Sequence, residues 1–210
     1  MAILGTVPPP VSVQEEIDRA SKFGQSLEDL VVSKGSVTLG QAGDRDRLLL
    51  AYWSLALDYD KSILALMQNK FYGGAFALLR PLVEAQVRAH VVLMDSDDDV
   101  SRIMDDTYTV NFKTIGGEID TAFGLDGYFD KFLNGAKGAL HSFTHSGLSQ
   151  LGRRFDGDDL GAHYVDEEVI EVIRTSSTAV FFVTNLLTKH FKFVDEGKKV
   201  EELFLEWGKH

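Results

Sequence analysis

Three charged side chains recur at four-residue spacing in an otherwise apolar stretch, ALLRPLVEAQVRAH at residues 77–90. Arg80, Glu84 and Arg88 stand at positions i, i+4 and i+8, which follow one face of an α-helix. Two guanidinium groups beside a carboxylate can hold a phosphate or carboxylate ligand, while the glutamate orients them or acts as a base. The spacing therefore predicts Arg80 and Arg88 as ligand-binding residues and Glu84 as a catalytic residue.

The same stretch also has a structural interpretation, an ion ladder in which the three side chains satisfy one another at the edge of a bundle. Pro81 stands next to Arg80. A proline inside a helix removes one backbone hydrogen bond and clashes with the preceding turn, at a cost of about 3 kcal/mol. We therefore expect a kink beside Arg80 or a helix that effectively starts later. The apolar neighbours are expected to pack in the core: Leu79, Leu82, Val83 and Val87.

A second group of polar residues lies in NGAKGALHSFTHSG at 134–147, where Asn134, Gly138, His141 and His145 share one helical face. We predict His141 and His145 as catalytic residues for proton transfer near neutral pH, and Asn134 as a ligand-binding residue. Stabilisation of the histidines by the C-terminal end of the helix dipole is the structural alternative.

The spacing of His141 and His145 also suits a metal ion, but the glutamate of a His-Glu-x-x-His arrangement is missing. We therefore predict no metal site, and a histidine and carboxylate site stays as an alternative. Small residues recur on the same helix at Gly135, Gly138, Ser142 and Ser146, and close helix packing is their simplest explanation.

Helical periodicity accounts for most of the chain. Ser12 and Glu15 form a capping-box pattern at the start of a helix over about 12–33, and a long helix begins near Asp44. Its expected stripe is Leu48, Tyr52, Leu55, Tyr59, Ile63 and Leu66. A third helix follows the FYGG break at 71–74 and ends near residue 94, and two short helices are expected between about 98 and 124.

The C-terminal half of the chain continues the pattern. A helix over about 127–147 should end at Gly147 as a left-handed C-cap, and residues 148–164 read as irregular. Asp166 can cap a long helix to about residue 190, and a short helix closes the chain. The buried stripe expected on the long helix is Val169, Ile173, Ala179 or Val180, Val183 and Leu187.

No alternating run or internal repeat competes with these helices. We predict an all-α, single-domain helical bundle of about five to seven helices over residues 1–210, with residues 1–11 as a flexible N-terminal segment.

Composition sets the remaining expectations. The chain of 210 residues is 44% hydrophobic, has a formal net charge of -11 and contains no cysteine. The charge disfavours nonspecific DNA binding and acidic membranes, and the missing cysteines exclude disulfides and thiolate nucleophiles. The apolar runs fall short of the roughly 20 residues that span a membrane. The common nucleotide-binding motifs are also missing. We expect a soluble cytoplasmic protein with no membrane association and no cofactor.

The stretches FALLRPLVEAQVR and LHSFTHSG resemble bacterial helical proteins of unknown function that pair an Arg-x-x-x-Glu helix with a later His-Ser/Gly helix end. These proteins are distantly similar to the HEPN superfamily, and the resemblance extends loosely over residues 44–190. It implies a helical bundle, often dimeric, that binds nucleotides or cleaves RNA without a metal in toxin–antitoxin and phage-defence systems.

The chain departs from the catalytic HEPN signature, in which an arginine is followed after four to six residues by a histidine. No arginine precedes His141 or His145 at that distance, and Lys137 is too close to the first and too far from the second. RNA cleavage would therefore need Arg80 or Arg88, on another helix, to supply the positive group.

Two hypotheses follow from the sequence. In the first, the Arg80/Glu84/Arg88 face meets the His141/His145 face in one polar pocket that binds a small phosphate-bearing ligand or a specific RNA, in a protein that forms a homodimer. In the second, the same residues form a buried ion-pair network in a noncatalytic structural or protein-interaction module. The sequence leaves open whether the protein is an enzyme.

Overall fold

The computed structural model describes residues 11–34, 42–94 and 97–209, so residues 1–10 of the predicted flexible segment lie outside the described part. Within it, nine α-helices follow one another, with a turn of 3-10 helix and a short hairpin between α7 and α8. The helices are α1 Val13–Val32, α2 Asp44–Gln68, α3 Tyr72–Met94, α4 Asp97–Met104, α5 Ile115–Phe123, α6 Tyr128–Thr144, α7 Leu148–Leu151, α8 Asp166–His190 and α9 Val194–Trp207.

The all-α prediction is confirmed, but the prediction of about five to seven helices is wrong. Helices α4 and α5, with eight and nine residues, correspond to the two short helices expected between about 98 and 124, and the helix that was not expected is α7, with four residues. A helix of a single turn does not show an apolar period in the sequence. The segment predicted to be irregular holds α7, the 3-10 turn η2 Gly152–Arg154 and the antiparallel strands β1 Phe155–Asp156 and β2 Asp159–Leu160.

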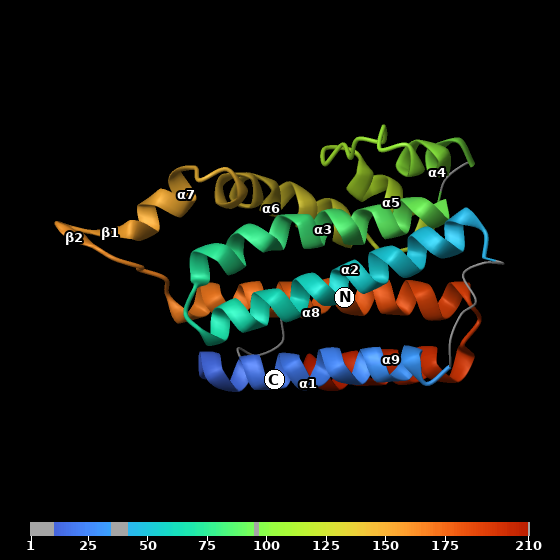
Figure 1. Cartoon of the computed structure of the whole chain (residues 1–210), viewed down its shortest axis with the longest axis horizontal. Helices are drawn as coiled ribbons and strands as arrows, with labels where there is room; N and C mark the ends of the chain where they lie inside the picture. Colours follow the sequence, from blue (N-terminus) through green and yellow to red (C-terminus); the bar gives the residue numbers. More distant parts are fainter. Residues whose placement is uncertain (1–10, 35–41, 95–96, 210) are drawn as a thin grey trace.

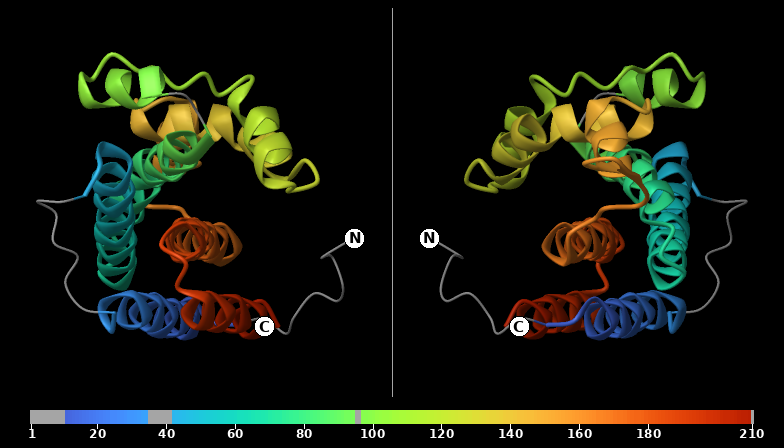
Figure 2. Two further views of the ribbon diagram at one scale, coloured as in Figure 1. Left: turned by 90° about the vertical axis from the view of Figure 1, so that its right-hand side faces the viewer. Right: turned by 90° about the vertical axis from the view of Figure 1, so that its left-hand side faces the viewer.

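Helix α8 lies at the centre of the bundle (Figures 1 and 2). It packs against α1, α2, α3 and α9. Helix α3 packs against α2 and α8, and also against α6 and α5. The hairpin of β1 and β2 extends from one end of the molecule (Figure 1). This arrangement places α3 between the centre of the bundle and α6, so one face of α3 is available to meet α6.

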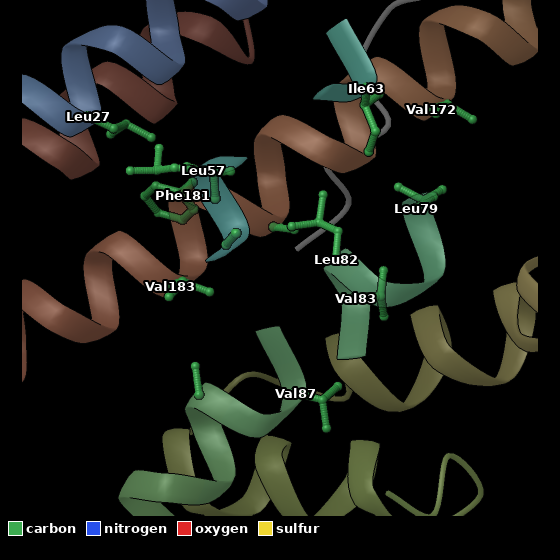
Figure 3. Packing of buried hydrophobic residues seen from close by; sticks show 14 of the residues in the cluster. Leu27, Leu57, Ile63, Leu79, Leu82, Val83, Val87, Val172, Phe181 and Val183 are labelled. Atoms are coloured by element: carbon green, nitrogen blue, oxygen red, sulfur yellow. The ribbon is translucent and has the colours of Figure 1, made fainter. Parts of the chain in front are cut away.

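Apolar residues of α3 and α8 pack in the core together with residues of the other helices, such as Leu27 of α1 and Leu57 of α2 (Figure 3). The four neighbours of the charged residues in α3 are buried, as the sequence predicts: Leu79, Leu82, Val83 and Val87. The stripe predicted for α8 is buried as well: Val169, Ile173, Ala179, Val180, Val183 and Leu187. Helix α8 is long and apolar enough to cross a membrane, and 61% of its most apolar 18-residue stretch is buried inside the bundle. A core helix of a soluble bundle has the same composition.

The apolar stripe predicted for α2 does not coincide with the face of α2 that is buried in the structure. Ile63 is buried as expected, but Leu55 is 38% exposed. The buried positions of α2 are Leu49, Ala56, Leu57, Asp60, Ile63, Leu64 and Met67. The reason is that α2 packs against three helices, α1, α3 and α8, so its buried face is wider than a single stripe and is centred elsewhere.

The start of α1 confirms the predicted capping box. Ser12 Oγ accepts the Glu15 backbone N–H at 3.2 Å, and Ser12 N–H donates to Glu15 Oε2 at 2.9 Å. The start of α6 is capped differently, because Asp120 accepts the backbone N–H groups of Phe129 and Asp130, both at 2.9 Å. The Asp120 carboxylate in α5 thereby fixes the orientation of α6 relative to α5.

The break expected at FYGG falls at Phe71, ahead of both glycines, and the later helix start expected at Pro81 does not occur. The helix begins at Tyr72, so both glycines of FYGG lie inside it, and it continues through Pro81 without starting again. Gly73 serves packing, because a Cβ there would lie 2.9 Å from Arg154 Nη2 and 3.0 Å from the Tyr164 hydroxyl. The single backbone bond lost at Pro81 is tolerated because the buried apolar residues on both sides of it hold α3 in the core.

The end of α6 also differs from its prediction. Gly147 has φ −74 and is not a left-handed cap; Ser146 takes the left-handed conformation with φ 52. A Cβ on Gly147 would lie 2.6 Å from Ser142 Oγ, so the glycine allows the chain to fold back closely over α6. Gly147 N–H donates to the Ser142 carbonyl at 2.7 Å, and Ser149 N–H donates to Ser142 Oγ at 2.9 Å.

Candidate functional site

Arg80, Glu84 and His141 come together between α3 and α6. Arg80 Nε donates to Glu84 Oε1 at 2.9 Å, and Arg80 Nη1 lies 3.0 Å from His141 Nδ1. The side chains of Arg80 and Glu84 are 25% and 32% exposed, so the pair is shielded but open to water. The structure therefore joins the two polar faces that the sequence singled out.

The contact with Arg80 fixes the tautomer of His141. A guanidinium group has donors only, so Nδ1 must accept the hydrogen bond and the ring proton lies on Nε2. The ring of His145 lies beside that of His141, with 4.5 Å between centroids. In this arrangement His141 presents an N–H donor to any ligand that reaches Nε2.

A pocket of about 430 Å³ opens beside this contact. It is lined by Arg80 from α3, by Asn111, Phe112 and Lys113 from the segment before α5, and by Lys137, Gly138, Leu140 and His141 from α6. Three of these side chains are permanent cations and the lining holds no carboxylate. We call these eight residues the basic pocket. Its positive lining is a local feature in a chain whose net charge is -11.

The loop before α5 brings an aromatic ring to the basic pocket. Asn111 Oδ1 accepts the Lys113 backbone N–H at 3.1 Å, and the Asn111 carbonyl accepts from Thr114 and Ile115. These bonds form a tight turn that leads directly into α5. Phe112 is thereby held with its ring centroid 5.6 Å from Arg80 Cζ, a cation–π distance.

Gly138 keeps the basic pocket open. A Cβ at Gly138 would meet no atom within 4 Å, and the same is true at Gly135. Close helix packing, the explanation expected from the sequence, is therefore wrong for both glycines. Gly138 lines the pocket and Gly135 lies outside it, which makes the two a matched pair for substitution.

Arg88 lies in different surroundings. Its Nη2 donates to the Tyr108 carbonyl at 3.3 Å, and its guanidinium lies 5.8 Å from the Tyr108 ring centroid. Burial raises the pKa of the Tyr52 phenol, and the neighbouring Arg88 partly offsets this by charge and hydrogen bonding. The structure places Arg88 with these tyrosines and outside the basic pocket.

Asn134 is also outside the basic pocket. Its side chain is exposed and donates from Nδ2 to Asp130 Oδ1 at 2.9 Å, one turn earlier in α6. His145 is exposed at the end of α6 and reaches the site through its contact with the His141 ring. Of the predicted residues, the structure brings together Arg80, Glu84 and His141.

Sequence reasoning did not identify the residues that complete the lining. Lys137 stands four residues before His141, so the helical spacing already places both on one face of α6. Asn111, Phe112 and Lys113 come from a loop without periodicity. Their only local signal is the asparagine ahead of a helix start, which indicates a turn but not what the turn faces.

The chain belongs to a family of unknown function. The profile of this family (DUF6988) matches residues 53–201, which include every residue of the basic pocket. No curated protein and no solved structure matches the chain. Within the described residues, three or more His, Asp or Glu side chains do not gather in a way that could hold a metal ion.

Proposed function

We propose that the protein binds a small phosphate-bearing ligand, such as a nucleotide, in the basic pocket. The observation that supports this proposal is the lining: Arg80, Lys113, Lys137 and His141 border one cavity from three parts of the chain, and no carboxylate borders it. Phosphate is attracted to such a site by charge and by N–H donors. The cavity volume of about 430 Å³ lies within the range of small-molecule sites.

Six of the lining residues have a direct role in this proposal. Arg80 is oriented by Glu84 and His141, and its Nη2 has no hydrogen-bond partner among the described residues, so it is available to a phosphate oxygen. Lys113 and Lys137 add positive charge. Phe112 and Leu140 offer an apolar surface on which a planar base can lie.

Two features favour this function over a structural ion-pair network. The Arg80 and Glu84 side chains are partly exposed, whereas the noncatalytic module of the second hypothesis was expected to hold a buried network; the exposure agrees equally with an ion ladder at the edge of the bundle. The cavity beside them is open to a ligand. Binding of a specific RNA, catalysis by Glu84, His141 and His145, the HEPN likeness, homodimer formation and a cytoplasmic location stay predictions from the sequence.

Isothermal titration calorimetry with adenosine 5′-monophosphate and adenosine tests the proposal. The monophosphate should bind at least roughly tenfold more tightly, because only its phosphate meets the cations. Arg80→Gln should weaken binding of the monophosphate, and Gly138→Leu should block it by filling the cavity. Gly135→Leu is the matched control on the same helix and should bind like the wild type. Equal binding of the two compounds, or no effect of either pocket variant, would overturn the proposal.

A further inference from the structure

A second polar site lies between α1 and α2, on residues that the basic pocket does not use. The Asp60 carboxyl group on α2 is buried, with 2% of the residue exposed. Its Oδ1 accepts a hydrogen bond from Ser176 Oγ on α8 at 2.5 Å. Among the described residues, Oδ2 has no hydrogen-bond donor. Oδ2 is therefore available to a hydrogen-bond donor that does not belong to these residues.

Oδ2 faces a groove of about 400 Å³. The groove is lined by Ile17, Ser21, Gly24 and Gln25 of α1 and by Leu57, Asp60, Lys61, Leu64, Ala65 and Gln68 of α2. A Cβ on Gly24 would lie 3.2 Å from Asp60 Oδ2. The glycine thus allows α1 to approach Asp60 closely, because a side chain at this position would crowd Oδ2.

The lining of the groove contains one carboxylate, Asp60, and one cation, Lys61. The Lys61 Nζ is paired with Glu28 Oε2 at 2.8 Å. Burial raises the pKa of Asp60 to about 6, and the Ser176 hydrogen bond and the Lys61 charge oppose this rise. At neutral pH the carboxylate form prevails, and a buried carboxylate is costly unless a cation compensates it.

We propose that the groove between α1 and α2 binds a primary alkylammonium group, which donates to Asp60 Oδ2. An ammonium group suits this site better than a guanidinium group, because Oδ1 is already occupied and a bidentate contact is not available. Asp60 is the one carboxylate in the lining, and a divalent metal ion requires several oxygen ligands, so the groove does not suit such an ion.

The rest of the lining fits the remainder of such a ligand. Ile17, Leu57 and Leu64 provide an apolar wall for an alkyl chain. Ser21 and Gln25 add polar side chains to the lining. This site is independent of the basic pocket and of the function proposed for it.

Titration of the ¹⁵N-labelled protein with 1-butylammonium chloride tests the proposal, with 1-butanol as the neutral probe of the same length. The ammonium should shift the backbone amide of Gly24 saturably, and the alcohol should not. The Gly147 amide, which lies at the end of α6, should stay in place with both probes. Equal shifts of Gly24 with the two probes would show that charge is not recognised and would overturn the proposal.

Two variants locate the binding group. Asp60→Asn keeps the shape of the side chain and removes its charge, and it should weaken binding of 1-butylammonium by at least roughly tenfold. Gly24→Ala keeps Asp60 and places a methyl group beside Oδ2, and it should also weaken binding. Gly117→Ala is the matched control, since a Cβ there meets no atom within 4 Å. Binding of wild-type strength in both Asp60→Asn and Gly24→Ala would contradict the proposal.

Discussion

Replacement of Glu84 by alanine distinguishes a ligand pocket from a structural ion network. The Arg80 and Glu84 side chains form a pair at 2.9 Å within one helix and are 25% and 32% exposed. A helical i, i+4 pair of this exposure contributes about 0.5 kcal/mol, and arginine before glutamate is the weaker order. We therefore expect Glu84→Ala to lower the free energy of unfolding by about 0.5 kcal/mol, whereas loss of a buried partner costs about 3–5 kcal/mol.

Glu16 provides a comparison for the loss of about 3–5 kcal/mol that is expected when a buried ion pair is broken. Glu16 is fully buried and accepts from Arg19 at 2.7 Å and from Arg174, on α8, at 2.9 Å. Glu16→Ala leaves both arginines without this carboxylate and should cost about 3 kcal/mol.

Urea denaturation measures both variants on one scale. With a slope of about 2 kcal/mol per molar, the midpoint should fall by roughly 0.25 M for Glu84→Ala and roughly 1.5 M for Glu16→Ala. A midpoint loss for Glu84→Ala as large as that for Glu16→Ala would refute the reasoning, because Glu84 would then be part of a structural network.

Three further predictions concern groups outside the basic pocket. Burial lowers the pKa of His90 from 6.5 to about 4. The free energy of unfolding should therefore fall by up to about 3 kcal/mol as the pH drops from 6.5 to 4, because the unfolded chain takes up the proton first. Urea denaturation of His90→Gln over the same pH range should not show this fall. Burial raises the pKa of Asp60 from 3.8 to about 6, so the stability given by its protonated form is lost as the pH rises from 4 to 6. The advantage of Asp60→Asn over the wild type should accordingly grow by about 2–3 kcal/mol between pH 4 and pH 7, and an advantage that is independent of pH would contradict this. In Gly116→Ala the new Cβ would lie 2.6 Å from Asp130 Cα, so calorimetric melting should show a loss of about 1–3 kcal/mol, while Gly117→Ala should cost nothing.

The meeting of Arg80, Glu84 and His141 follows largely from local rules. The four-residue spacing places Arg80 and Glu84 on one face of α3, and the apolar residues between them fix that helix in the core. His141 reaches Arg80 because α6 packs on α3. The sequence predicts each face, but their contact depends on the tertiary arrangement of two helices.

Arg88 was predicted to share a site with Arg80, and helix geometry explains why it lies outside the basic pocket. Eight residues advance the helix by about 12 Å and rotate it by roughly 80°. Arg88 therefore points to Tyr108 and Tyr52, whereas Arg80 faces the basic pocket. A spacing of i, i+8 is too long for both arginines to hold one phosphate.

The loop residues of the basic pocket could not be predicted from local pattern. Phe112 and Lys113 have no period, and their position depends on the turn at Asn111 and on the packing of α5 against α6. The groove beside Asp60 could not be predicted from the sequence either, because it depends on how the helices pack. An aspartate within a long amphipathic helix is normally exposed, and only the packing of α1, α2 and α8 around it reveals that it is buried.

The most direct test of phosphate binding is the ¹⁵N spectrum of the histidine side chains during titration with inorganic phosphate. We expect the His141 ring nitrogens to show the Nε2–H tautomer and to shift saturably in the wild type, and not to shift in Arg80→Gln. His163 and His190, which lie outside the basic pocket, should stay unchanged. Unchanged His141 resonances at saturating phosphate, or equal shifts in all three histidines, would contradict the proposal that the basic pocket binds phosphate.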